Sequence, residues 1–255
     1  MKSLLLSLAV SSIISAGSIV APGVDAATEG DSNNAYPFNS QGIDFLNGMR
    51  YQQVYSSSEF ASLGGPVTIS AILFRPDGIV GNAFFATLSS VLIELSTTPV
   101  TPATLSTTFA NNIGSNDTIV FNGPLALSSS FAGPSGGPKD FDIVINLTTP
   151  FVYDPSAGSL LLDVRNFDGS RADRTGQFDS DATATGTQRV FSTTDVNATT
   201  GTLGGDGTQV GFNDRGLVTE FEFTATTPEP STFGMAILGV IGLIALARLK
   251  LFATH

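Results

Sequence analysis

The chain has 255 residues, no cysteine, one histidine and a formal net charge of −11. An acidic chain repels phosphate backbones, so we predict no nucleic-acid partner. Because the one histidine is residue 255, the preceding residues cannot assemble a Ser-His-Asp triad, a Cys-His dyad or a histidine-based metal site.

The N-terminus has the pattern of a signal peptide. Lys2 precedes two apolar runs, at 4–10 and 13–20, and small residues then lead up to Ala26. This order predicts cleavage by signal peptidase between Ala26 and Ala27. An uncleaved N-terminal anchor is the alternative, but the serine-rich run with no basic stop after it favours cleavage.

Residues 27–42 are polar, and we expect them to form a flexible lead-in. The body that follows, 43–226, alternates apolar and polar residues or has short β-prone runs, and it has no amphipathic helical stripe of useful length. The expected strands fall within 43–55, 66–76, 86–97, 118–121, 125–127, 141–147, 159–167, 189–192 and 217–224.

These strands predict an all-β fold. Asn47-Gly48 marks a hairpin turn, and the run at 66–76, bounded by prolines, predicts a strand buried on both faces. Some nine or ten strands separated by turns favour an antiparallel β-sandwich of jelly-roll type. A closed barrel or a β-solenoid remains the alternative, although we find no repeat of fixed length.

The C-terminus carries a motif, an apolar run and a basic end, in that order. Residues 227–232 read TPEPST, an uncharged run follows at 233–247, and Arg248 and Lys250 come after it. The uncharged run alone spans about 22 Å as a helix, against about 30 Å for a bilayer core. Apolar neighbours extend it to residue 252, so we predict a transmembrane helix over 233–252 with its basic end in the cytoplasm.

This tail resembles the PEP-CTERM sorting signal of bacterial exported proteins, a type of tail that is also classified as an ice-binding protein C-terminal domain. Pro228, Glu229 and Pro230 match the motif, and Arg248 and Lys250 match the basic end. The resemblance implies export, transient retention in the inner membrane, and cutting near the motif by an exosortase. Two shorter pieces, at 51–60 and 151–167, also resemble stretches of PEP-CTERM proteins.

Candidate catalytic residues are few. Glu220 and Glu222 lie on one face of the strand expected at 217–224, and two carboxylates are enough for glycoside hydrolysis. Alternate acidic residues are also what a solvated strand face carries, so we predict no catalytic site. If a sugar bound, Tyr51, Tyr55 and Tyr153 could line a shallow cleft for it.

Aspartates gather in the segment from 163 to 186, and loops rich in carboxylates suit calcium. The spacing matches no known calcium loop, and interleaved arginines favour a salt-bridged or mobile surface loop instead. No cofactor is therefore expected, and the weak Ca²⁺ candidates are Asp168, Asp173, Asp179 and Asp181.

Taken together, the sequence predicts an exported protein of the cell surface or extracellular matrix. Its body is expected to be a non-enzymatic structural or adhesive module associated with exopolysaccharide. A carboxylate-based glycan hydrolase or lyase, and a binding module for glycan or Ca²⁺, are the alternatives.

Overall fold

The computed structural model of the chain describes residues 12–39, 47–168, 175–205 and 215–228. Its contacts separate a body, Ala16–Thr224, from a second unit formed by Met1–Ser15 and Ala225–His255. Of the second unit, only 12–15 and 225–228 are described, as the ends of two strands.

Strands make up the body, and the described helices are short 3₁₀ turns. The strands are β1 (Ser12–Ala21), β2 (Ser32–Asn34), β3 (Met49–Tyr55), β4 (Val67–Phe74), β5 (Phe84–Thr98), β6 (Thr118–Ser129), β7 (Ile143–Tyr153), β8 (Ser159–Asn166), β9 (Phe178–Asp181), β10 (Thr187–Ser192), β11 (Thr202–Leu203), β12 (Gly216–Leu217) and β13 (Thr219–Pro228). The 3₁₀ turns are η1 (Gly23–Asp25), η2 (Ser57–Leu63), η3 (Pro102–Thr104), η4 (Phe109–Asn112) and η5 (Pro155–Ala157). The predicted all-β class is confirmed.

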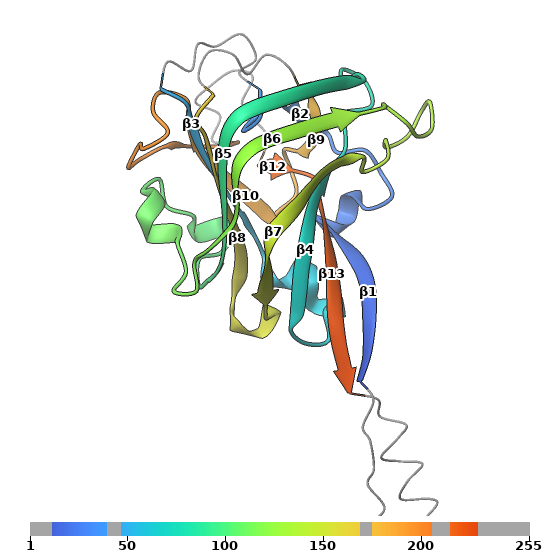
Figure 1. Cartoon of the computed structure of the whole chain (residues 1–255), viewed down its shortest axis with the longest axis vertical. Coiled ribbons are helices and arrows are strands. Elements are labelled where there is room, and N and C mark those ends of the chain that lie inside the picture. Colours follow the sequence, from blue (N-terminus) through green and yellow to red (C-terminus); the bar gives the residue numbers. More distant parts are fainter. Residues whose placement is uncertain (1–11, 40–46, 169–174, 206–214, 229–255) are drawn as a thin grey trace, which may run out of the picture. The chain divides into compact units, whose positions relative to one another are not determined.

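Three sheets are formed (Figure 1). One has the order β1-β13-β4-β7, the second β11-β10-β3-β8-β5-β6, and the third β12-β9-β2. Every pair whose register is resolved is antiparallel, for example β3 with β8 and β4 with β7. The predicted antiparallel pairing is therefore confirmed for these strands.

The core lies where the four-stranded and six-stranded sheets face each other. Tyr55 of β3 meets Phe221 of β13 edge-on at 5.0 Å between ring centroids, and its hydroxyl lies 2.8 Å from Thr219 Oγ1. Phe60 of η2 packs on Tyr153 of β7 at 4.9 Å. Alternation explains this core, because every second side chain of a strand points to the same face.

Individual strands follow the predicted pattern with local differences. Val91, Ile93 and Leu95 of β5 are fully buried, as their alternation predicts. The two segments expected at 118–121 and 125–127 form one strand, β6, and β4 is buried except for half-buried Thr68 and Ser70. Of the predicted hairpin around Asn47-Gly48, only β3 is described, since 40–46 lie outside the described residues.

Residues 27–39 belong to the body, which corrects the flexible lead-in predicted for 27–42. Strand β2 pairs with β9, opposite Ser180, Asp179 and Phe178, and Tyr36 and Phe38 beyond it are fully buried. A polar strand can still be buried when its backbone is paired on a sheet and its side chains find partners. Composition alone therefore misjudged this segment.

The segment from 163 to 186 corrects a second expectation, that of a surface loop. Residues 178–181 are strand β9, the central strand of the small sheet, and all four residues are buried. Residues 169–174 lie outside the described part. Buried aspartates look like surface aspartates in a sequence, and only their partners distinguish them.

Both chain ends carry predictions that the described residues leave open. Strand β1 falls inside the predicted signal peptide, which is part of the chain in this structure. Residues 1–11 are not described. No helix among the described residues has the length and apolar character required to cross a membrane. The predicted helix at 233–252 lies outside them.

Candidate functional site

The continuation of β4 and strand β9 bring two distant aspartates together. After β4, the chain runs alongside β9: Pro76 forms a bridge with Phe178, and the Asp179 N–H donates to the Arg75 carbonyl at 3.0 Å. The Asp77 N–H donates in turn to the Gln177 carbonyl, also at 3.0 Å. This backbone pairing places Arg75 opposite Asp179 and Asp77 opposite Gln177, so Asp77 and Asp179 are diagonal neighbours.

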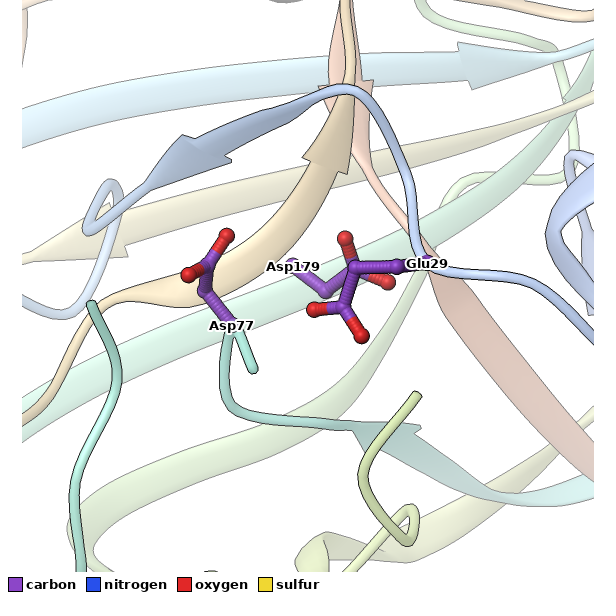
Figure 2. A group of neighbouring side chains, drawn as sticks. All are labelled: Glu29, Asp77 and Asp179. Carbon is purple, nitrogen blue, oxygen red and sulfur yellow. The ribbon is translucent and has the colours of Figure 1, made fainter. Parts of the chain in front are cut away.

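Glu29 completes an acidic group from a third segment (Figure 2). The Gly30 N–H next to it donates to Asp179 Oδ1 at 3.0 Å, and Glu29 Oε1 accepts from the Gly78 N–H at 2.5 Å. Carboxylate oxygens of Glu29, Asp77 and Asp179 all lie within 4.8 Å of one another. We call these three residues the acidic triad.

Arg75 is the buried cation beside the triad. Its Nε and Nη2 atoms each lie 2.6 Å from Asp179 Oδ2, and both side chains are at most 1% exposed. Nη2 also donates to the carbonyls of Asp25, at 2.9 Å, and of Thr28, at 2.6 Å. One guanidinium thus joins β9 to the N-terminal segment.

Burial shapes the protonation of the triad. It raises the pKa of Asp179 to about 7, outweighing Arg75, which lowers that pKa. Burial and the neighbouring Asp181 carboxyl raise the pKa of Asp25 to about 7 as well. Two carboxyls of this region therefore hold protons to higher pH than ordinary aspartates do.

The triad presents the hard oxygen ligands that Ca²⁺ takes in proteins. Of the triad, Glu29 lines a pocket of about 200 Å³, together with Gly78 and Ile79. Hydrogen bonds already use both Asp179 oxygens and Glu29 Oε1, and Asp77 Oδ1 accepts from the Ile79 and Val80 N–H groups. In the described structure the triad therefore acts first as a clasp that holds segments together.

The predicted calcium residues do not form one site. Asp179 belongs to the triad, whereas Asp168 accepts from Ser89 and Asp181 accepts from the backbone of Thr183 at 2.6 Å. Asp173 lies outside the described residues. Sequence reasoning missed Glu29 and Asp77, which lie about 150 and 100 positions before Asp179 and carry no shared local pattern.

The predicted carboxylate pair lies on the outer face of β13. Glu222 is exposed and Glu220 is half-buried, while Phe221 between them is fully buried. This is the arrangement expected of a solvated strand face. The three tyrosines proposed to line a sugar cleft, Tyr51, Tyr55 and Tyr153, are instead fully buried. Aromatic residues fit a core as readily as a cleft, so their sequence positions could not decide.

A second polar network spans the six-stranded sheet. Arg50 Nη2 donates to Asp163 Oδ2 at 2.7 Å, and Gln52 Nε2 donates to the same oxygen at 2.7 Å. Glu94 lies opposite Asp163 on β5, and burial raises its pKa, with Asp117 and Asp163 adding to the rise. The Arg50 guanidinium also stacks over the Phe109 ring at 4.7 Å.

The processing residues are described only in part. Ala26 and Ala27 are exposed, and the peptide bond between them lies between the two carbonyls that Arg75 binds. Pro228 is the last residue of β13. Glu229, Pro230, Arg248 and Lys250 lie outside the described residues, so the sorting motif stays a prediction.

No protein-family model, curated protein or solved structure that was compared with the chain matches it. The fold and the site therefore define the class of protein only as all-β with antiparallel sheets. Function rests on the residues themselves.

Proposed function

We propose that the chain is the precursor of an exported bacterial surface or matrix protein whose body is a non-enzymatic β-sandwich. The observation that carries this is the order of parts at the C-terminus: Pro228, Glu229 and Pro230, then the uncharged run at 233–247, then Arg248 and Lys250. Each part fits one step of export, namely recognition, membrane retention and orientation.

The structure supports the proposal where the body meets the motif. Strand β13 ends at Pro228, the first proline of the motif. Proline cannot donate a backbone hydrogen bond, and the residue before it avoids the helical region. From these two properties of proline we expect an extended, unpaired motif, which suits recognition by an exosortase-type enzyme.

The sandwich assignment, and its jelly-roll type, belong to the proposal. Support comes from the packing of two antiparallel sheets on one another through Tyr55, Phe60, Tyr153 and Phe221. Such modules serve as structural or adhesive units and need no catalytic group. Exopolysaccharide is the partner we propose, because the body exposes polar strand faces of Thr, Ser, Asn and Glu.

Cleavage after Ala26 is part of the same proposal. It would remove Asp25, and with it one of the two carbonyls that Arg75 binds. The bonds from Arg75 to Thr28 and Asp179 would remain, so the N-terminal end of the processed chain stays attached to the body. Processing therefore leaves in place the bonds by which Arg75 joins the N-terminal segment to β9.

The competing function is a carboxylate-based glycan hydrolase or lyase, for which Glu220 and Glu222 are the candidate residues. Their positions on an open strand face weigh against it, because glycosidases place two carboxyl groups on opposite sides of the bound sugar. Turnover of a polysaccharide that disappears in Glu220→Gln or Glu222→Gln would overturn the non-enzymatic proposal.

The test is to express the full chain in cells with and without an exosortase, then to fractionate them and determine both ends by mass spectrometry. We expect a start at Ala27, an end near Pro228, and location outside the inner membrane. Without the exosortase, we expect the chain to stay in the inner membrane with its tail intact. A full-length chain in the cytosol would contradict the proposal.

A further inference from the structure

Strand β13 has one edge that the predicted processing would uncover. In the four-stranded sheet, β13 lies between β1 and β4 (Figure 1). Gly17 of β1 lies against the Phe223 ring, so closely that an added Cβ would come within 3.0 Å of Phe223 Cζ. Strand β1 thus covers this edge, and Gly17 leaves the room that the Phe223 ring occupies.

The backbone direction at this edge follows from one contact. Ser70 Oγ of β4 donates to the Glu222 carbonyl at 3.4 Å, so that carbonyl points toward β4. Successive residues of a strand point their N–H and C=O groups to opposite sides. The N–H and C=O of Phe223 therefore point toward β1.

Strand β1 falls entirely within residues 1–26, and this inference rests on the proposed cleavage after Ala26. Cleavage there removes β1 and leaves the outward N–H and C=O groups of β13 without their strand. A row of such groups is a template for another strand. In β13, Thr219–Pro228, there is no lysine or arginine, and the only proline is the last residue, so Glu220 and Glu222 are the only protecting residues of this edge.

We propose that a second processed copy occupies this edge, with the two β13 strands paired antiparallel across a two-fold axis at Phe223. A two-fold pair uses the same surface on both copies, so one edge suffices. The backbone N–H and C=O groups of Phe223 point toward the uncovered edge. In a pair centred on Phe223, residues whose backbone groups face the edge therefore lie opposite residues of the same kind. This register also overlaps almost the whole strand.

Charge disfavours one neighbouring register. The register centred on Phe223 places Glu222 of each copy opposite Thr224 of the other. In the neighbouring register, centred on residue 222, Glu222 of one copy would lie opposite Glu222 of the other. Like charges directly opposite each other are destabilising. The Phe223 rings meet at the axis, and aromatic cross-strand pairs are favourable.

The pairing also implies an order of events. In an antiparallel pair the two β13 strands end in opposite directions, and the Pro-Glu-Pro motif follows directly on each strand. Because the two tails leave the pair in opposite directions, they do not easily insert together into one membrane. Pairing therefore follows both cuts, which would keep precursors apart until they leave the inner membrane.

The test starts from the full chain, processed in cells that contain an exosortase. Mass spectrometry determines the two ends of the chain. Sedimentation equilibrium measures the molecular mass at concentrations from about 1 to about 100 µM, the range of dissociation constants of an interface of moderate affinity. We expect a chain starting at Ala27 to be a dimer and the unprocessed chain in detergent not to dimerise through β13. A chain correctly cut at both ends but monomeric would overturn this inference and leave the proposed function standing. A chain that keeps residues 12–21 would overturn both.

Two opposite changes at one position test the register. Thr224→Lys places a lysine opposite Glu222 twice in the pair and should tighten dimerisation about two- to tenfold, whereas Thr224→Glu should weaken it by a similar factor. The control is Val152→Glu, since Val152 is exposed on β7, at the other edge of the same sheet. We expect it to leave dimerisation unchanged. Equal effects of Thr224→Lys and Thr224→Glu would overturn the register.

Discussion

Two buried arginine–aspartate pairs in the body differ in what they connect. Arg50 and Asp163 lie on the adjacent strands β3 and β8, with Gln52 donating to the same carboxylate. Arg75 and Asp179 join the end of β4 to β9, and Arg75 also binds carbonyls of the N-terminal segment. The first pair lies within one sheet, whereas the second also ties the end of β4 and β9 to the N-terminal segment.

Their electrostatic surroundings differ as well. Asp179 shares its site with Glu29 and Asp77, so three carboxylates face one guanidinium. Asp163 has two side-chain donors, Arg50 and Gln52. A buried ion pair is worth little when every group is satisfied, but removing one partner leaves a charge uncompensated. The comparison therefore predicts different consequences for similar substitutions.

The largest effect is expected for Arg75→Ala. At about pH 8, where Asp179 is ionised, its carboxylate would remain buried without its cation, and the carbonyls of Asp25 and Thr28 would lose their donor, so we expect a loss of about 3–5 kcal/mol in the free energy of unfolding. Urea denaturation measures it. The control is Arg165→Ala, because Arg165 is more exposed and 3.7 Å from Glu94, and should cost less than about 1 kcal/mol. Similar losses for the two variants would contradict the inference that Arg75 holds the N-terminal segment and β9 together.

Arg50→Ala should come next, with a loss of about 3 kcal/mol, at the lower end of the range for a broken buried pair, because Gln52 still donates to Asp163. The comparison is sharpened by limited proteolysis. We expect Arg75→Ala to expose the segment at 25–30 to proteases, and Arg50→Ala to leave it protected. Cutting of that segment in both variants would show that the two regions are not independent.

Stability should fall as the pH rises from about 4 to about 7 and then level off. Asp25 and Asp179 bind protons more tightly in the folded chain, where their pKa is about 7, than at the ordinary value of 3.8. The folded state therefore holds more protons in this window, and raising the pH lowers the free energy of unfolding. Denaturation at pH 5 and pH 8 measures the difference.

Cleavage after Ala26 should reduce this pH dependence, since Asp25 leaves with the signal peptide and Asp179 alone remains. Asp25→Asn in the uncleaved chain is the matched variant, and we expect the same reduced slope. If stability rose with pH over this window, the burial of these two carboxyls would not control it.

The smallest effect is expected on the outer face of β13. Glu220→Gln and Glu222→Gln should change the free energy of unfolding by no more than about 0.5 kcal/mol, as surface substitutions usually do. Thermal unfolding at constant pH provides the check. A change as large as that in Arg50→Ala would mean that these carboxylates have buried partners.

The sequence predicted the strands better than their burial. The local pattern located β5 and β8 within two residues, because the period of two is a local property of a strand, but β7 runs six residues beyond the strand predicted at 141–147. The alternation of apolar and polar residues did not predict the strands at 32–34 and 178–181. Both segments are polar, and their burial depends on pairing with each other. Polar residues in a sheet are satisfied by partners from elsewhere in the chain, and a local pattern carries no record of these.

The candidate site shows the same limit. Asp179 is one of the four weak calcium candidates, but Glu29 falls in the predicted flexible lead-in, and no local pattern singles out Asp77. They meet because Pro76 bridges Phe178 and the Gly30 N–H reaches Asp179. Each contact spans at least a hundred positions of sequence, so no spacing rule could have grouped the three.

By itself, the sequence determined the all-β class and the order of parts at the C-terminus, since composition and nearest-neighbour pattern are enough for both. Only the tertiary structure decided which carboxylates lie together, which arginine binds them and which strand covers the edge of β13. The physical reason is that these features depend on pairing between distant strands, where backbone hydrogen bonds bring side chains together regardless of their separation along the chain.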